Sequence, residues 1–340
     1  MQASVRLSEA RSLLSMPLTP GFSAGKRSGT PPLEVTLRRG CISESQHRVH
    51  AVVCDGRGRV LMCAGDPGFE TFIRSALKPF QALPFLSSGA VEQMEVGDRG
   101  VAISCASHAG TNTHAREAFK LLWKADLEAS QLQCPIPAGA DSPLQHNCSG
   151  KHAAFLATSR KMSWPLENYL QSDHPLQVEV NRRVAELLGL PAEELVAARD
   201  DCGAPTLRLQ LAQMALLYAH LGASRQAEFE QISRAMLAHP ELVAGDGRFD
   251  TELMRRSHGQ VLSKGGAEGI QCLSRIGEGL GVAIKVEDGS KRAKQAVALH
   301  LLRQLEWLTP MGLQELEEQV LVINPGVNLE VSGALRFQES

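Results

Sequence analysis

Arg74-Ser-Ala-Leu-Lys78-Pro79 is the stretch of this chain from which its fold and chemistry can be worked out. Ser75 and Lys78 are three positions apart, so in a helix they lie on the same face. Pro79 is tolerated only in the first turn of a helix, which places Ser75 near a helix N-terminus, where developing negative charge is favoured. A desolvated lysine amine can remove the proton of a neighbouring hydroxyl. The stretch predicts a serine nucleophile with a lysine base; the alternative is a capping serine followed by an exposed lysine.

Two distant segments carry the same kinds of side chain. Ser107 lies in Ala106-Ser-His-Ala-Gly110, and Lys264 lies in Ser263-Lys-Gly-Gly-Ala-Glu-Gly269. A Ser-x-x-Lys motif with a distant Lys-[Thr/Gly]-Gly is the skeleton of serine acyl-transfer enzymes of the β-lactamase and penicillin-binding type. The three segments together predict a serine hydrolase site.

The composition excludes several classes of protein. The chain has 340 residues, 43% hydrophobic and 21% charged, which is typical of a soluble globular protein large enough for a full core. A formal net charge of −2 and the lack of a sustained basic stripe argue against nucleic acid as a partner. No apolar run approaches the roughly 18 residues that cross a bilayer, so no membrane association is expected.

Residues 1–32 differ from the rest of the chain. They are rich in Ser, Gly, Pro and Leu, contain little acid and show no strand pattern. We expect a disordered N-terminal extension, with a transit peptide as the alternative. Residues 33–340 are then expected to form a single domain.

The chain has eight cysteines, most of them in apolar, strand-like surroundings where they behave as small buried hydrophobic residues. There is no Cys-x-x-Cys pair and no recognisable secretion signal. Free thiols and a cytoplasmic location are therefore expected.

The pattern of expected elements predicts the fold class. Strands are expected at both ends of the chain and helices between them, which indicates an α/β (α+β) fold: an antiparallel sheet flanked by helices, with a helical insertion. The sheet part covers about 33–107 and 257–340, the helical part about 108–256, and a cleft between them is a natural site. The expected strands are Val35–Cys41, Arg48–Cys54, Arg59–Ala64, Gly259–Ile276, Gly281–Val286, Val320–Ile323 and Val327–Leu335, with a hairpin turn at Asp55–Gly58. The expected helices are Ala115–Leu127, Pro175–Leu188, Pro205–Leu221, Gln226–Ala238 and Ser290–Leu308.

A second group of reactive side chains surrounds two cysteines at polar, turn-like positions. Cys148 lies in His146-Asn-Cys-Ser-Gly-Lys-His152, and Cys202 lies in Asp200-Asp-Cys-Gly-Ala-Pro205. Thiolate, imidazole and carboxylate groups bind zinc. A shared metal or reactive-thiol site is one interpretation, and two buried structural thiols are the other. Lys151 could ligate a metal only as the neutral amine.

Other polar residues near these motifs have two interpretations each. Arg74 could bind a substrate carboxylate through its fork of N–H donors, or it could be an ordinary surface arginine. His152 and His108 are as compatible with satisfied structural histidines as with catalytic ones.

Taken together, these segments resemble the rhizobial-type, or class 3, L-asparaginases, a family distinct from the bacterial type I/II and plant-type enzymes. The resemblance runs from about Leu33 to the C-terminus and implies a fold related to serine β-lactamases, hydrolysis of asparagine to aspartate and ammonia, and a homodimer. The matching segments are Glu44-Ser-Gln-His47, Arg74-Ser-Ala-Leu-Lys-Pro-Phe-Gln81, Ala106-Ser-His-Ala-Gly110, His146-Asn-Cys-Ser-Gly-Lys-His152, Asp200-Asp-Cys-Gly-Ala-Pro205 and Lys264-Gly-Gly-Ala-Glu-Gly269.

The resemblance also implies roles for individual residues. It implies two Ser–Lys tandems in one active site, a zinc ion held by two cysteines and a lysine with water as a fourth ligand, and three residues that border the site and bind substrate. The tandems are Ser75 with Lys78 and Ser107 with Lys264; the zinc ligands are Cys148, Lys151 and Cys202; the bordering residues are Arg74, His152 and Asp200. We expect Ser75 to be acylated, because its lysine lies in the same helical turn, and Ser107 to relay protons or support the oxyanion.

The chain departs from the family pattern in a few places, of which Asp201 matters most. It replaces the glycine usual in Asp-Gly-Cys-Gly, so it bears on metal affinity. The alternatives to an asparaginase are a β-lactamase or peptidase-like serine hydrolase and an inactive zinc-dependent binding protein of the same fold. The first alternative is disfavoured because the chain has no Ser-Asp-Asn motif and carries Lys-Gly-Gly where Lys-Thr-Gly is expected.

Overall fold

A single long strand, β2 (Ile42–Asp55), organises the main sheet of the computed structural model, which describes residues 30–338. Strands β1 (Leu33–Arg39) and β3 (Val60–Ala64) pair with successive parts of one edge of β2, and β9 (Leu280–Val286) pairs with the other edge. The order is β10-β11-β1-β2-β9-β8-β7, with β12 joined to β3, and every pairing is antiparallel. The remaining strands are β7 (Val261–Gly265), β8 (Ile270–Arg275), β10 (Val322–Asn324), β11 (Val327–Ser332) and β12 (Arg336–Phe337). The predicted antiparallel sheet is confirmed.

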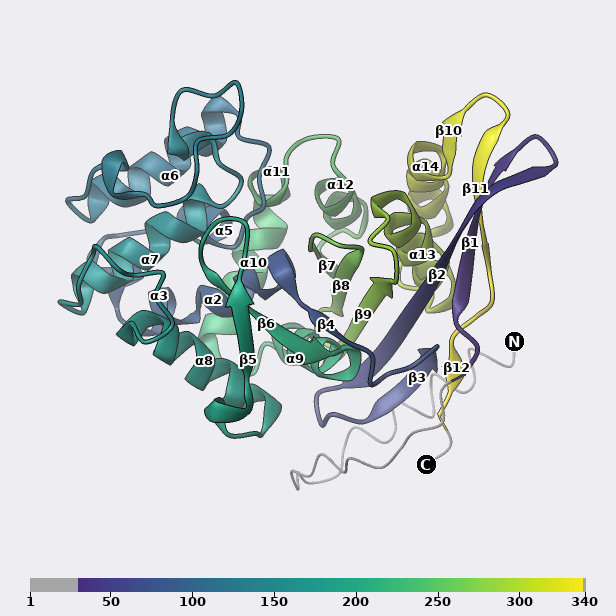
Figure 1. Cartoon of the computed structure of the whole chain (residues 1–340), viewed down its shortest axis with the longest axis horizontal. Helices are drawn as coiled ribbons and strands as arrows, with labels where there is room; N and C mark the ends of the chain where they lie inside the picture. The colour runs from purple at the N-terminus through teal and green to yellow at the C-terminus, as the bar shows by residue number, and fades with distance from the viewer. Residues whose placement is uncertain (1–29, 339–340) are drawn as a thin grey trace.

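Both faces of this sheet are buried, each under a different set of helices (Figure 1). Successive side chains of a strand point to opposite faces. Val52 and Cys54 of β2 therefore join the core shared with α9 (Leu211–Ala223), whereas Ala51 and Val53 join the core shared with α13 (Lys291–Gln304) and α14 (Pro310–Val320). Helix α9 approaches the sheet closely because β9 has a glycine there: a Cβ at Gly281 would lie 2.0 Å from the Ala215 carbonyl oxygen.

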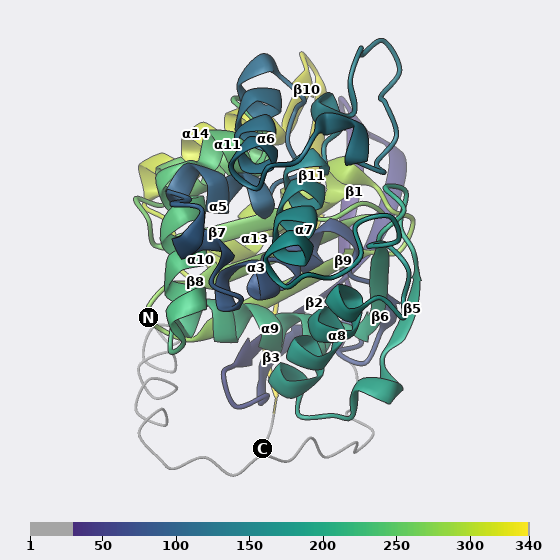
Figure 2. The ribbon, with the colours of Figure 1, turned by 90° about the vertical axis from the view of Figure 1, so that its left-hand side faces the viewer.

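Apart from α12, the rest of the helices gather on one side of the molecule, beyond α9 (Figures 1 and 2). They share one hydrophobic core with the α9 face of the sheet. These helices are α2 (Lys78–Gln81), α3 (Leu83–Ser87), α4 (Ala90–Gln93), α5 (Asp98–Ser104), α6 (Asn112–Lys124), α7 (Ser149–Lys161), α8 (Pro175–Leu188), α10 (Ala227–Ala238) and α11 (Pro240–Val243). Helix α12 (Phe249–Arg256) packs against β7 and α14, and its Phe249 and Leu253 join the core of the opposite face. Short 3-10 turns are η2 (Arg74–Leu77), η3 (Ala129–Gln131), η4 (Pro143–Gln145) and η5 (Ala192–Glu194).

One expected helix is wrong in its first third. The segment expected to be helical over Pro205–Leu221 begins as strand β6 (Pro205–Gln210) and becomes helical only in α9. Strand β6 pairs with β4 (Glu70–Phe72) and β5 (Val196–Arg199) in a small antiparallel sheet. Leucines at 207 and 209 fit both a strand period and a helix period, and pairing with β4 decides in favour of the strand. The helical part of the chain therefore contains two strands.

Most other expected elements lie close to their predicted positions. The hairpin turn at Asp55–Gly58 is present, with the Gly58 N–H donating to the Asp55 carbonyl and Gly58 at φ 78°. The Gly259–Ile276 stretch forms two strands, β7 and β8, and Val320 ends a helix before β10 begins. The disordered extension expected for 1–32 falls almost wholly outside the described residues. Within residues 30–338, no helix is long and apolar enough to span a membrane.

Candidate active site

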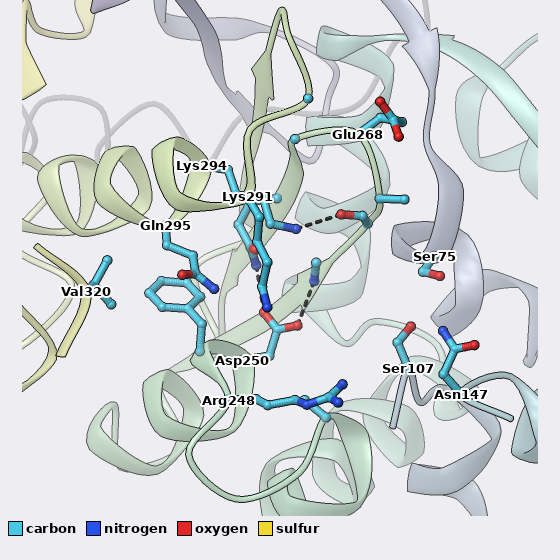
Figure 3. Close-up of a pocket in the computed structure, with 18 of the residues that line it drawn as sticks. Ser75, Ser107, Asn147, Arg248, Asp250, Glu268, Lys291, Lys294, Gln295 and Val320 are labelled. Carbon is cyan, nitrogen blue, oxygen red and sulfur yellow. Dashed lines mark hydrogen bonds between the residues drawn. The ribbon is translucent and has the colours of Figure 1, made fainter. Parts of the chain in front are cut away.

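The two serines singled out by the sequence line one pocket, with a cavity volume of about 480 Å³, between the helical side and the sheet (Figure 3). Ser75, Ser107 and Asn147 form one end of this pocket. Segments at the ends of β7, α12 and α13 form the remainder, including Asp250 and Lys294. The pocket lies between the sheet and the helices, where the sequence predicted a cleft.

Ser107 is the hydroxyl on which the two lysines converge. Lys264 Nζ lies 2.8 Å from Ser107 Oγ, and Lys78 Nζ lies 3.0 Å from the same atom. Both lysine side chains are almost fully buried, with exposed fractions of 0% and 1%. Two amines held against one hydroxyl in a site shielded from water are the arrangement that general-base activation of an alcohol requires.

Backbone contacts fix this arrangement by joining three chain segments. The Ser107 N–H donates to the Val243 carbonyl at 2.8 Å, and the His108 N–H donates to the Asn147 carbonyl at 3.2 Å. Lys78 Nζ also donates to the Ala106 and Asn147 carbonyls, at 2.6 and 3.3 Å. The lysine therefore holds the Ser107 segment against the start of α7.

The expected side-chain contact between the Ser75 hydroxyl and the Lys78 amine is not among the hydrogen bonds of residues 30–338; these two residues are joined only through the Lys78 backbone N–H, which donates to the Ser75 carbonyl. Ser75 lies in the 3-10 turn η2, after Arg74, whose φ of 53° is in the left-handed region. A buried amine requires acceptors, and the carbonyls beside Ser107 supply them, so the Lys78 side chain extends inward to Ser107. In the described part of the chain, the Ser75 hydroxyl has no hydrogen-bond partner. It lies at the same end of the pocket as Ser107 (Figure 3).

Lys264 is poised to lose its proton near neutrality. Burial lowers its pKa to about 7, and the nearby charge of Lys78 acts in the same direction. Asp250 opposes this effect, because its carboxylate favours the ammonium form. A lysine with a pKa near 7 is suited to act as a base at physiological pH.

Asp250 is a site residue that the sequence did not reveal. Its carboxylate accepts hydrogen bonds from the Ser263 hydroxyl at 2.7 Å, the Gly265 N–H at 2.8 Å and the Gln271 amide at 2.8 Å. It thus holds β7 on both sides of Lys264. Asp250 occupies the second position of an ordinary amphipathic helix, α12, so no motif marks it.

The three residues expected to hold zinc lie together and buried. Lys151 Nζ lies 3.2 Å from Cys202 Sγ, and Cys148 lies at the N-terminus of α7, one turn before Lys151. The pKa of the Cys148 thiol lies well below its usual value because Cys202 hydrogen-bonds to it and outweighs burial. Burial alone would lower the pKa of Lys151. The two nearby cysteines have the larger effect, so the pKa of Lys151 is raised.

This donor set fits a zinc ion on chemical grounds. Two thiolates are preferred zinc ligands, and an amine can complete the set once it gives up its proton. In the described residues, no group of three or more His, Cys, Asp and Glu side chains could hold a metal ion. The cluster at Cys148 has only two such side chains, and its third donor is the amine of Lys151.

The residues expected to bind substrate are engaged elsewhere. The Arg74 guanidinium pairs with Asp200 and Asp201, each at 2.7 Å, so its donors are already directed at carboxylates. Asp201, the departure from the family pattern, is 90% exposed and has no left-handed backbone to strain it. His152 is fully buried, with Nδ1 2.8 Å from the Tyr169 hydroxyl and a pKa lowered to about 4 by burial. None of these side chains lines the pocket.

Comparison with known proteins identifies the class to which this fold and site belong. Residues 35–337 match the family model described as L-asparaginase II, so the chain belongs to that family. This match confirms the family resemblance found in the sequence. No curated protein matches the chain.

Solved structures offer only distant similarity. One is Mglu in its native form, with 14% identity and a TM-score of 0.37 over 76% of this chain and 64% of that chain. Another is a β-lactamase from Mycobacterium bovis, with 10% identity and a TM-score of 0.37 over 77% of this chain and 95% of that chain. The chain spans less than two thirds of the length of Mglu.

Proposed function

We propose that this protein hydrolyses the side-chain amide of L-asparagine to L-aspartate and ammonia through an acyl-enzyme on a serine. The observation that carries the proposal is the contact of two buried lysine amines, Lys264 and Lys78, with the single hydroxyl of Ser107. Membership in the L-asparaginase II family supplies the substrate class. The pocket beside these groups has room for an amino acid.

In the first step, neutral Lys264 takes the proton of the Ser107 hydroxyl, and Oγ attacks the amide carbon. The carbon–nitrogen bond then breaks, and the nitrogen leaves as ammonia after it receives the proton held by Lys264. Water then attacks the ester carbon as its proton passes to Lys264; the bond to Ser107 Oγ breaks, Lys264 returns the proton to Oγ, and aspartate is released with both groups restored. General-base assistance of this kind contributes about 10²–10⁴ in rate.

Ser107 replaces Ser75 as the proposed nucleophile. The preference for Ser75 rested on its spacing from Lys78, whereas the structure directs that lysine to Ser107. Ser75 faces the same space and supplies a hydroxyl donor to the substrate. The zinc ion would be held by Cys148, Lys151 and Cys202, where it would supply a fixed positive charge and hold α7 against the Cys202 loop.

The test is a coupled ammonia assay on L-asparagine with the wild type and with Ser107→Ala, Ser75→Ala and Lys264→Met. Ser107→Ala and Lys264→Met should each lose at least about 10²-fold in kcat. Rapid quenching followed by intact-mass analysis and peptide mapping should place the acyl group on Ser107. An acyl group found on Ser75 would reverse the assignment of the serines.

The two alternatives have their own readouts. Nitrocefin hydrolysis by the wild type without ammonia release from asparagine would indicate a β-lactamase-like enzyme. Equilibrium binding of asparagine without turnover, in zinc-loaded protein, would indicate a binding protein. Near-normal ammonia release by both Ser107→Ala and Lys264→Met would eliminate the mechanism.

A further inference from the structure

An amino-acid substrate brings a carboxylate into the pocket, and the arginine expected to bind it is already occupied. Arg74 is paired with Asp200 and Asp201 and does not line the pocket. A second arginine, Arg248, does line the pocket, together with Ser75 and Ser107. Its side chain extends toward the serine end (Figure 3).

Arg248 is positioned by a loop that packs on the segment of Ser107. This loop joins α11 to α12, and its start is tied to the site because the Ser107 N–H donates to the carbonyl of Val243, the last residue of α11. Gly245, at φ 125°, packs so closely that a Cβ there would lie 2.9 Å from the Ala109 Cβ. The loop therefore has little room to move relative to Ser107.

The guanidinium of Arg248 lacks a partner because its nearest acids in the chain are taken. Asp246 pairs with Arg255 at 2.7 Å. Glu252 pairs with both Arg255, at 3.1 Å, and Arg256, at 2.5 Å. Among residues 30–338, the Arg248 side chain makes no ion pair or hydrogen bond. The carboxylate of Asp250, in the same pocket, is engaged by the Ser263 hydroxyl, the Gly265 N–H and the Gln271 amide. A charged group with five donors and no ion-pair partner is set to receive an anion.

The other cations of the pocket are less suitable. The Lys294 amine already donates to the Gly266 and Ile270 carbonyls, at 2.6 and 2.9 Å. Lys291 lies on α13, across the pocket from the serines (Figure 3). Arg248 alone combines an unengaged charge with a place at the end where the amide must bind, and its planar fork matches a carboxylate.

We propose that Arg248 binds the α-carboxylate of the substrate and thereby restricts the site to side-chain amides of free amino acids. The inference rests on the proposed amide hydrolysis. It follows that asparagine whose α-carboxylate is capped, as in its methyl ester or within a peptide, is a poor substrate.

The experiment compares L-asparagine with L-asparagine α-methyl ester in the wild type, Arg248→Gln, Arg248→Lys and a control. The control is Arg234→Gln, because Arg234 pairs with Asp98 on the surface and does not line the pocket. Arg248→Gln should raise KM for asparagine by about 10- to 100-fold, the usual effect of losing a hydrogen bond between charged groups, with a smaller change in kcat. It should leave kcat/KM for the ester unchanged.

Arg248→Lys should retain part of the affinity, and Arg234→Gln should resemble the wild type on both substrates. Equal cleavage of asparagine and its ester by the wild type would overturn the proposal. An unchanged KM for asparagine in Arg248→Gln would do the same.

Calorimetric titration with L-aspartate separates this proposal from the proposed hydrolysis, because it measures binding without turnover. Failure of the wild type to release ammonia would refute the hydrolysis alone. Weaker aspartate binding by Arg248→Gln than by the wild type and Arg234→Gln would still support the carboxylate site, and equal binding would overturn it. A thermal unfolding scan of each variant excludes misfolding as the cause.

Discussion

Lys264 Nζ lies 2.8 Å from Ser107 Oγ although the two residues are 157 positions apart in the chain. Lys264 belongs to strand β7 of the main sheet, and Ser107 follows α5, a helix on the other side of the pocket in a segment that was expected to belong to the sheet part. The contact therefore forms only when the two parts of the fold are assembled. It also brings a hydroxyl against an amine that burial has made a weaker base.

The activity should depend on pH through Lys264. Its pKa is lowered to about 7, by burial first and then by Lys78, and the neutral amine is the active form. Therefore kcat/KM should be nearly constant above pH 8 and fall about tenfold per unit well below pH 7. Ammonia release measured from pH 5 to 9 checks this. In Lys264→Arg the arginine cannot lose its proton in this range. The residual activity of that variant should therefore lack the acidic limb, which is the fall in kcat/KM below pH 7. A wild-type profile flat down to pH 5 would contradict the assignment.

Asp250 should determine the pH at which the acidic limb of the kcat/KM profile falls. Its carboxylate favours the ammonium form of Lys264, so Asp250→Asn should lower the pKa of Lys264 and move the limb to lower pH. The variant should also lose about 1–3 kcal/mol of stability, because the amide cannot satisfy all of the buried donors around it. Asp246→Asn is the control, since Asp246 is an exposed acid paired with Arg255. A pH profile of kcat/KM and a urea unfolding curve measure both effects. An unshifted limb in Asp250→Asn would show that the carboxylate does not tune the lysine.

Parts of the fold and site could be predicted because they depend on local pattern. Runs of β-branched and apolar residues indicated the strands of the main sheet, and the hairpin turn at Asp55–Gly58 was confirmed by the left-handed Gly58. The segment 205–210 was wrongly expected to be helical because its leucines fit either period. Only pairing with β4 decides it, and that contact is distant in the chain.

The site shows the same division between local and distant effects. Sequence motifs pointed to Ser107 and Lys264, but the i, i+3 spacing suggested that Lys78 would contact Ser75. The acceptors that draw Lys78 to Ser107 are backbone carbonyls, which no motif encodes. No sequence pattern marked Arg248, because its charge is unpaired only since the neighbouring acids are bound to other arginines.

Gly150 should be essential to the geometry of the site. It lies in the first turn of α7, and a Cβ there would lie 2.1 Å from the Ile103 carbonyl oxygen, a backbone atom that cannot turn away. Gly150→Ala should therefore destabilise the protein by about 1–3 kcal/mol or more through overpacking. It should also lower kcat, because α7 carries Lys151 and packs beside Ser107. Gly56→Ala is the control, as its Cβ would meet only one atom at 3.9 Å. Urea unfolding midpoints of both variants check the prediction. Equal midpoints for Gly150→Ala and Gly56→Ala would contradict it.

Zinc should stabilise the folded protein if Cys148, Lys151 and Cys202 hold it. A ligand that binds only the folded state at 100 times its Kd adds about 2.7 kcal/mol to the free energy of unfolding, so Tm should rise on adding zinc and fall after chelation. Cys202→Ser should remove most of this response, because it deletes a sulfur that contacts Lys151. Cys41→Ser is the matched control, since Cys41 is an exposed thiol in the turn after β1. Calorimetry, together with a count of thiols protected from a disulfide reagent, gives two independent readouts. If adding zinc changes neither the Tm of the wild type nor its number of protected thiols, the amine of Lys151 keeps its proton and serves as the cation of this cluster.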